Sequence, residues 1–169
     1  GGVGVHGGKN NVIENNIMLP TLVDGGHTRV AQLYSDSVSG RVECWQMLGF
    51  NAGNRFRNNI IYSVAEAATS YLYVIYNYSD RLLAESDYNL FYNSTGRYEV
   101  LDRSGHVGDG DTAVSLGEWQ KLGYDAHSVV ADPMFVDPEG EDFRLDPESP
   151  ALRLGFAPIP VDRIGVRSE

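Results

Sequence analysis

The sequence predicts an all-β protein whose short strands are wound into a solenoid, and two observations support this prediction. The first is a repeat, because Asn11-Val-Ile-Glu-Asn-Asn-Ile-Met18 returns as Asn54-Arg-Phe-Arg-Asn-Asn-Ile-Ile61 and, in degenerate form, as Ser86-Asp-Tyr-Asn-Leu-Phe-Tyr92. The second is composition, because 19 glycines and 10 tyrosines among 169 residues are typical of turn-rich β proteins. Each copy places asparagine before bulky apolar residues, so each copy predicts one bend between two strands.

Asparagine residues mark the bends of this repeat. Asn16, Asn59 and Asn89 occupy equivalent positions in the three copies. Asparagine takes the left-handed backbone conformation more readily than most residues, so we expect these three residues to be left-handed and stacked. Residues 20–40 interrupt the pattern and lengthen the interval between the first two copies. Insertions at the turns of a solenoid often build its binding face.

The remaining strands are predicted by β-prone runs that lie between turn residues. Residues 1–19 suggest two or three short strands separated by glycines, Val42–Phe50 suggests a further strand, and Ser70–Tyr76 is strongly β-prone. Residues 1–93 are therefore assigned to about three rungs of the solenoid, with the insertion at 20–40. Residues 94–169 are assigned to a loop, a short helix and a capping tail of the same domain.

A capping box predicts one helix near the C-terminus. In Ser115-Leu-Gly-Glu118 the serine hydroxyl can accept from the first-turn amides while the glutamate reaches back to the cap. Trp119 and Leu122 would share one face, and Gly123 can end the helix. The proline-rich tail that follows blocks a longer helix. Because the last rung of a solenoid exposes apolar surface, the helix and tail are expected to cap it.

The charge of the chain limits its partners. A formal net charge of −10 disfavours nucleic acid and anionic membranes, both of which attract basic proteins. A neutral polysaccharide is compatible with this charge. Cys44 lies alone in an apolar run and is interpreted as a buried structural thiol. The chain has no initiator methionine and begins inside a patterned segment, so we expect a piece of a longer protein.

Three segments resemble a known family. They are Gly4-Val-His-Gly-Gly-Lys-Asn-Asn-Val-Ile-Glu-Asn-Asn-Ile17, the repeated Asn-Asn-Ile bend, and a closing string from Trp119 through Asp132-Pro-Met-Phe135 to Gly155. Together they resemble the C-terminal part of right-handed parallel β-helix proteins of the pectate-lyase-like superfamily, including glycoside hydrolase family 141. The resemblance implies a secreted or periplasmic bacterial protein that acts on polysaccharide. It also implies that N-terminal rungs, or another chain, complete the solenoid.

The leading hypothesis for function is glycoside hydrolysis, which requires two carboxyl groups on opposite sides of the scissile bond. Asp24, Asp36 and Glu43 are the candidate catalytic residues, because they lie in or just after the insertion, and Glu14 on a neighbouring rung is a further candidate. The candidate substrate-binding residues are His6, Lys9, His27 and Arg29. No catalytic motif of the family can be placed on this sequence residue by residue.

Two other hypotheses remain open. A uronate lyase would need a basic residue and a means of neutralising the substrate carboxylate, often Ca²⁺. The pair Asp109-Gly-Asp111 suggests calcium, but Gln120 stands where an EF-hand loop needs glutamate, so no cofactor is expected. The third hypothesis is a non-catalytic end-piece that is structural or binds carbohydrate.

Overall fold

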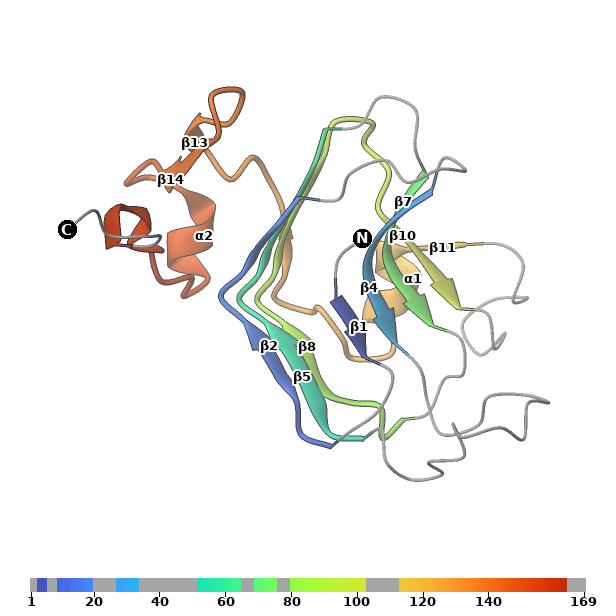
Figure 1. Cartoon of the computed structure of the whole chain (residues 1–169). Coiled ribbons are helices and arrows are strands. Elements are labelled where there is room, and N and C mark those ends of the chain that lie inside the picture. The colour runs from blue at the N-terminus through green and yellow to red at the C-terminus, as the bar shows by residue number, and fades with distance from the viewer. Residues whose placement is uncertain are drawn as a thin grey trace.

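The computed structural model describes residues 3–5, 9–19, 27–33, 52–64, 69–75, 80–102 and 113–163. Within these ranges the chain is mostly strand, with two short α-helices and one 3₁₀ turn (Figure 1). The prediction of an all-β protein is therefore confirmed. The short strands agree with the alternation of glycine, asparagine and β-prone residues, because asparagine and glycine end each strand within a few residues.

Three of the four described sheets are built mainly of parallel strands. The first sheet has the order β1 (Val3–Val5), β4 (His27–Leu33), β7 (Thr69–Ile75) and β10 (Glu99–Asp102), with β11 (Val114–Ser115) added antiparallel to β10. The second sheet has the order β2 (Val12–Glu14), β5 (Asn54–Arg57) and β8 (Leu83–Asp87). The third sheet has the order β3 (Ile17–Met18), β6 (Ile60–Ser63), β9 (Leu90–Asn93) and β12 (Val129–Val130).

The chain visits the three sheets in the same order on successive passes, so that each of the strands β1 to β7, and β9, pairs with the strand three elements further along. The register places Ile17 opposite Ile60, and Ile60 opposite Leu90. The same register places Ile13 opposite Phe56. The three copies of the sequence repeat therefore lie directly on one another, as the sequence predicted. Figure 1 shows the β2, β5 and β8 strands stacked in this way.

The left-handed residues of the bends lie one position earlier than the sequence predicted. Positive φ angles occur at Asn15 (57°), Asn58 (51°) and Tyr88 (57°), and not at Asn16, Asn59 and Asn89. The prediction was wrong by one residue because the second asparagine has another role. It keeps an ordinary backbone and turns its side chain toward the neighbouring pass, as described below.

Two apolar clusters lie on opposite sides of the third sheet. The inner cluster fills the space between the three sheets and includes Phe56, Ile61 and Phe91. The outer cluster includes Ile60 and Leu90. Each of these residues directly precedes a member of the inner cluster, because successive side chains of a strand point to opposite faces of its sheet. The third sheet is consequently covered on both faces.

The helix α1 (Leu116–Gln120) begins where the capping box predicted. The Ser115 Oγ accepts a hydrogen bond from the Glu118 backbone N at 3.2 Å. The Glu118 carboxylate, however, accepts from the Lys121 Nζ at 2.6 Å, a partner other than the cap. Trp119 is fully buried in the inner cluster, whereas Leu122 is exposed. In Figure 1, α1 lies behind the strands and within the outline of the three sheets.

The C-terminal tail covers the side of the strands rather than their end. It contains the antiparallel pair β13 (Phe135–Asp137) and β14 (Asp142–Leu145), the helix α2 (Pro150–Arg153) and the turn η1 (Val161–Arg163). Its Ala151 and Phe156 belong to the outer cluster. The Asn58 Nδ2 donates to the Leu154 carbonyl at 2.7 Å, which joins the tail to a bend. Of the two predicted caps, only α1 lies at the end of the stack.

Candidate functional site

The structure describes only part of the site that the sequence predicted. Four of the expected residues lie outside the described ranges: His6, Asp24, Asp36 and Glu43. His27 and Arg29 lie on β4, opposite Thr69 and Tyr71 of β7. Lys9 precedes β2 and pairs with Ala52 through an isolated bridge. The calcium candidates Asp109 and Asp111, and the thiol Cys44, also lie outside the described ranges.

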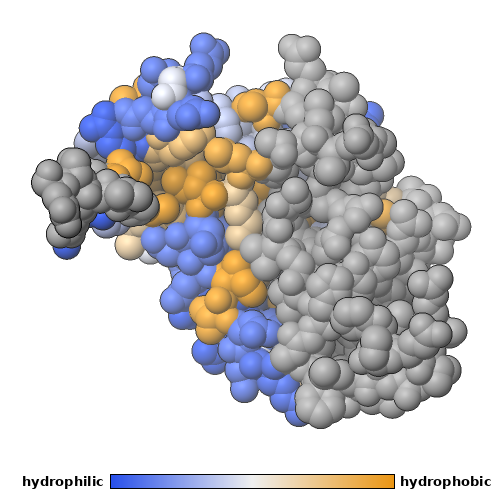
Figure 2. Space-filling model, viewed as in Figure 1, coloured by the Kyte–Doolittle hydropathy of each residue, from blue (hydrophilic) through white to orange (hydrophobic). Residues whose placement is uncertain are grey.

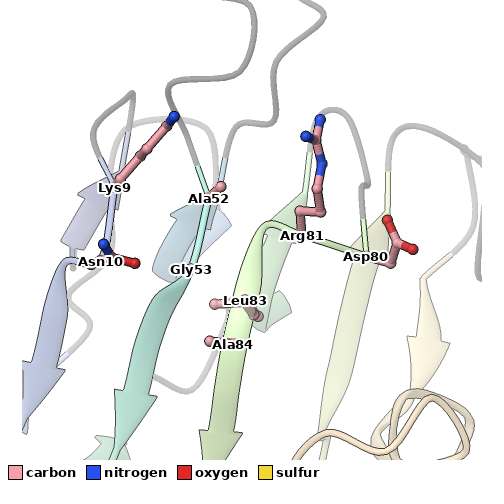
Figure 3. Close-up of a pocket in the computed structure, with 8 residues that line it drawn as sticks. All are labelled: Lys9, Asn10, Ala52, Gly53, Asp80, Arg81, Leu83 and Ala84. Carbon is pink, nitrogen blue, oxygen red and sulfur yellow. The ribbon is translucent and has the colours of Figure 1, made fainter.

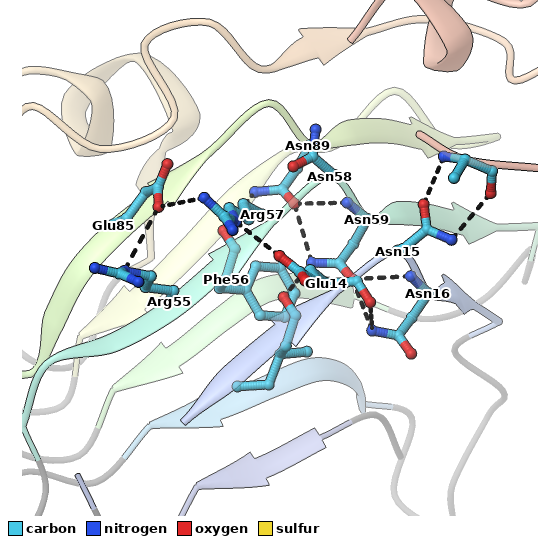
Figure 4. A network of polar contacts seen from close by, with 12 residues as sticks. Glu14, Asn15, Asn16, Arg55, Phe56, Arg57, Asn58, Asn59, Glu85 and Asn89 are labelled. Atoms are coloured by element: carbon cyan, nitrogen blue, oxygen red, sulfur yellow. Dashed lines mark hydrogen bonds and ion pairs between the residues drawn. The ribbon is translucent and has the colours of Figure 1, made fainter. Parts of the chain in front are cut away.

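The residue after the left-handed position is asparagine in all three bends, and these asparagines form a ladder of side-chain hydrogen bonds (Figure 4). The Asn16 Nδ2 donates to the Asn59 Oδ1 at 2.9 Å, and the Asn59 Nδ2 donates to the Asn89 Oδ1 at 3.2 Å. Each amide also donates to a backbone carbonyl of its neighbourhood, those of Glu14, Ile13 and Phe56 respectively. The ladder is directional, because every amide nitrogen points toward the next pass.

A buried carboxylate ends the ladder. The Asn89 Nδ2 donates to the Asp125 Oδ1 at 2.9 Å, and Asp125 is fully buried. Three further side chains donate to the two oxygens of this carboxylate: Ser128, Ser86 and Trp119, at 2.7, 3.1 and 2.9 Å. A carboxylate can accept all of these bonds because it carries two oxygens and no proton of its own.

Tyr73 extends this buried network. Its hydroxyl lies 3.0 Å from the Ser86 Oγ, and its ring is fully buried. Burial raises the pKa of Tyr73 well above its ordinary value, and the nearby Asp125 carboxylate raises it further. Because these groups have no access to solvent, the network stabilises the fold and is not a site for a substrate.

The outer face of the second sheet carries charges of both signs. We call Glu14, Arg55, Arg57, Glu85 and Asp87 the charged face. The Arg57 Nε lies 2.8 Å from the Glu14 carboxylate, and its Nη1 lies 3.3 Å from the Glu85 carboxylate (Figure 4). Arg55 lies 3.9 Å from the same Glu85 oxygen. The hydrogen bond to Glu14, followed by the charge of Glu85, raises the pKa of Arg57.

A histidine extends the charged face at the bend after β8. The His127 Nδ1 lies 2.6 Å from the Asp87 Oδ2, and the His127 backbone N donates to the Asp87 Oδ1 at 2.7 Å. The imidazole stacks on the Tyr88 ring with a centroid distance of 5.0 Å. Sequence reasoning missed this group. Asp87 and His127 are 40 positions apart in the sequence, so no local pattern links the two residues. Only the stacking of the passes brings their side chains together.

A pocket of about 380 Å³ lies at the beginning of the second sheet (Figure 3). Its floor is apolar and comprises Ala52, Gly53, Leu83 and Ala84; its polar lining comprises Lys9, Asn10, Asp80 and Arg81. Figure 3 shows the Lys9 and Arg81 side chains extending in the same direction, away from the strands. Lys9 is thus the one predicted binding residue whose described side chain lines a pocket.

The chemistry of these groups favours binding over bond cleavage. Each carboxylate of the charged face contacts a guanidinium or an imidazole, so its oxygens already have partners on the protein. A general acid must instead present its carboxyl group to the substrate. Among the described residues, no three side chains of His, Cys, Asp or Glu gather closely enough to hold a metal ion. The described surface therefore offers polar groups that can hold a ligand.

Comparisons with protein-family models, with curated proteins and with solved structures find no match to this chain. In the described part of the chain, no helix combines the length and the apolar character that crossing a membrane requires.

Proposed function

We propose that this chain is the C-terminal part of a right-handed parallel β-helix protein. Three features support the proposal. The chain passes repeatedly through three parallel sheets in one order, the asparagine ladder joins equivalent bends, and α1 covers one end of the strands. Such a stack gives each pass the same outward face, so polar side chains of different passes line up along it.

We further propose that the protein is carbohydrate-active and that its described surface binds the glycan. The charged face supports this proposal: carboxylates and guanidinium groups alternate across the second sheet, with Arg57 between Glu14 and Glu85. Sugar hydroxyls both donate and accept hydrogen bonds, so a surface that offers both kinds of partner suits them. The Tyr88 and His127 rings add an aromatic surface at the bend that follows β8.

Cleavage is assigned to carboxylates of the insertion, as the sequence suggested. Glu14 and Glu85 lie on strands separated by β5, so their backbones lie about 9.6 Å apart, near the separation of an inverting pair. Arg57 contacts both carboxylates, however, so both are already engaged in ion pairs on the sheet. Asp24, Asp36 and Glu43 therefore remain the proposed acid and base, and Glu14 and Glu85 the proposed binding residues.

One set of measurements tests both parts of the proposal. A panel of neutral and acidic oligosaccharides is offered to the wild-type protein, and binding and product formation are both followed. We expect Glu85→Gln to weaken binding about tenfold, because one charge-assisted acceptor is lost. Glu118→Gln, on the exposed side of α1, serves as the matched control and should leave binding unchanged.

Turnover separates the reaction classes. We expect at least two of Asp24→Asn, Asp36→Asn and Glu43→Gln to lower hydrolysis by about 10² or more, the usual contribution of an acid or base. Unchanged turnover in all three variants would remove the catalytic assignment. An unsaturated product with ultraviolet absorbance would identify a lyase. A third outcome would support a carbohydrate-binding end-piece. In that case the wild type binds the glycan without turning it over, and Glu85→Gln weakens the binding.

A further inference from the structure

One bend of the stack differs from the other two in the residue at its left-handed position. Asn15 and Asn58 occupy this position in the first two passes, whereas Tyr88 occupies it in the third, with a φ angle of 57°. Asparagine adopts left-handed backbone readily, but a bulky side chain adopts it rarely and at a cost in free energy. The register of the neighbouring passes imposes the conformation here, because β8 pairs with β5 and β9 pairs with both β6 and β12.

The asparagines of the first two bends hold the tail. The Asn15 Oδ1 accepts from the Ala157 backbone N at 2.6 Å. The Asn58 Nδ2 donates to the Leu154 carbonyl at 2.7 Å. Tyr88, which is 39% exposed, has no comparable contact, because its side chain forms no hydrogen bond to a described residue and belongs to neither apolar cluster. The third bend therefore carries a strained aromatic residue that neither the core nor the tail explains.

The rings of Tyr88 and His127 form a stacked pair that one carboxylate holds in place. The two ring centroids lie 5.0 Å apart, and the two ring planes differ by 6°. The Asp87 Oδ2 lies 2.6 Å from the His127 Nδ1. The Asp87 Oδ1 accepts from the backbone N atoms of His127 and Tyr88, at 2.7 and 2.8 Å. The pair is thus preorganised, so a ligand would not have to order it on binding.

The same carboxylate determines where the imidazole can accept a hydrogen bond. An ionised carboxylate only accepts, so the His127 Nδ1 carries a proton and, in the neutral ring, the Nε2 is the acceptor. The Nε2 has no partner among the described residues, and the His127 side chain is 64% exposed. The bend therefore presents one acceptor in a fixed position beside an exposed aromatic ring.

The charges around the bend favour a neutral ligand. Asp87 is the last residue of β8, and Glu85 lies two residues earlier, on the same face of the sheet. Arg57 is the register partner of Asp87, but its guanidinium contacts the carboxylates of two other residues. A ligand carboxylate would be repelled by Asp87, whereas a ligand hydroxyl would not. Figure 2 shows mainly hydrophilic surface around β2, the first strand of the same sheet, which suits a polar ligand.

We propose that Tyr88 and His127 form a subsite for one neutral pyranose residue of a glycan. The C–H face of the sugar lies against the exposed surface of the stacked rings, and one sugar hydroxyl donates to the His127 Nε2. A neutral pyranose meets both requirements, because its ring has an apolar face and its hydroxyl groups are hydrogen-bond donors. The inference rests on the proposed glycan-binding function, and it adds the charge class of the sugar and the two residues that select it.

Oligosaccharide titrations of the full chain test the subsite. The neutral probes are cellohexaose, mannohexaose and xylohexaose, and the acidic probe is hexagalacturonate. We expect at least one neutral probe to bind about tenfold more tightly than hexagalacturonate does. We expect Tyr88→Asn to weaken this binding about tenfold, while Tyr88→Phe, which keeps the ring, should change it less than about threefold.

The strain at Tyr88 separates loss of binding from loss of folding. Asparagine suits the left-handed position, so we expect Tyr88→Asn to keep the wild-type melting temperature or to raise it by about 2–4 °C. Met134 provides a matched control, because it also has a positive φ angle (59°), is 38% exposed and lies in the tail. Met134→Asn makes a similar exchange without changing an aromatic pair, and it should leave binding unchanged.

The imidazole is tested by the variant His127→Phe and by nitrogen NMR. His127→Phe keeps an aromatic ring against Tyr88 but removes the acceptor, so we expect about tenfold weaker binding. In the wild type, the nitrogen chemical shifts should place the proton on the His127 Nδ1, and the Nε2 signal should move when the neutral probe is added. A neutral ring with its proton on the Nε2 in the free protein would contradict the proposed acceptor.

Three results would overturn the proposal. The first is tighter binding of hexagalacturonate than of any neutral probe. The second is wild-type affinity in Tyr88→Asn when Glu85→Gln weakens binding, which would leave glycan binding on the charged face and remove this subsite. The third is a lower melting temperature in Tyr88→Asn together with weaker binding, because the ring would then support the fold. No binding of any probe to the wild type would contradict the glycan-binding proposal itself, and this inference with it.

Discussion

The two ends of the strand stack begin from the same repeat and finish in opposite ways. At the end that α1 covers, Asp125 accepts the last ladder bond and three more, and Trp119 fills the space between the sheets. At the other end, Asn16 has a free position on its oxygen within the described chain, and Ile13 and Ile17 are half-buried. Both ends have a bend followed by a short strand, so the bends alone do not account for the difference.

The difference follows from the direction of the ladder. An asparagine amide donates toward the next pass and accepts from the previous one, so a ladder that stops needs a terminal group that only accepts. The carboxylate of Asp125 meets this need with no unsatisfied proton, and among the described residues no buried side-chain N or O lacks a partner. A ladder that is to continue leaves an acceptor exposed, as at Asn16. A chain can thus close one end and keep the other available.

The largest expected effect comes from removing the closed terminus. Asp125→Ala leaves four donors without an acceptor in a buried site: Ser86, Asn89, Trp119 and Ser128. We expect a loss of about 3–5 kcal/mol in the free energy of unfolding. Urea denaturation followed by tryptophan fluorescence measures it.

The isosteric variant Asp125→Asn is the control for volume. It retains one acceptor oxygen, and the serine hydroxyls can reverse to accept from its amide, but one of the remaining donors stays unsatisfied. We expect a loss of about 1–3 kcal/mol. A loss below about 1 kcal/mol in Asp125→Ala would contradict the role of the carboxylate as the terminus of the ladder.

The second prediction compares the middle of the ladder with its exposed end. Asn59→Ala removes a buried amide that donates to Asn89 and to the Ile13 carbonyl, and we expect a loss of about 2–3 kcal/mol. Asn16→Ala removes an exposed amide whose carbonyl partner belongs to the exposed Glu14, and we expect less than about 1 kcal/mol. Both values come from the same urea titration. Equal losses of stability in the two variants would contradict the expected difference between the buried middle of the ladder and its exposed end.

The smallest effect is a pH dependence at the closed end. Tyr73 has a pKa raised well above its ordinary value, chiefly by burial. In the unfolded chain tyrosine loses its proton near pH 10, so between that pH and the folded pKa the unfolded state binds fewer protons. Stability from this group is therefore fully present below about pH 10 and falls as the pH rises above it. Unfolding titrations across this range should show a shallower decline in Tyr73→Phe, and an identical slope would contradict the assignment.

Local sequence signals predicted the scaffold because they act over a few residues. The repeat identified equivalent positions that the register of β3, β6 and β9 confirms. The Ser115 cap likewise predicted the start of α1, because the hydroxyl and the Glu118 amide are three residues apart. The left-handed position was assigned one residue late. In the first two copies, two adjacent asparagines are equally suited to it by type, and in the third copy the left-handed residue is Tyr88, a type that gives no such signal.

Long-range pairs could not be predicted in the same way. Asp125 was one of many acidic residues in the tail, and nothing beside it indicates that it lies beneath Asn89 and Trp119. The pair of Asp87 and His127 and the contacts of Arg57 with Glu14 and Glu85 also depend on strand register. The catalytic prediction for Asp24, Asp36 and Glu43 remains a prediction, because those residues lie outside the described ranges.

The sequence by itself determined that this chain is a β protein of repeated bends, because asparagine, glycine and branched apolar residues set the backbone locally. Tertiary structure alone decided which asparagine makes the bend and which makes the ladder, and where the ladder ends. It also decided that the tail lies along the third sheet and not across its end. The physical reason is that a hydrogen bond between passes has a direction and a register, and both exist only once the passes are stacked.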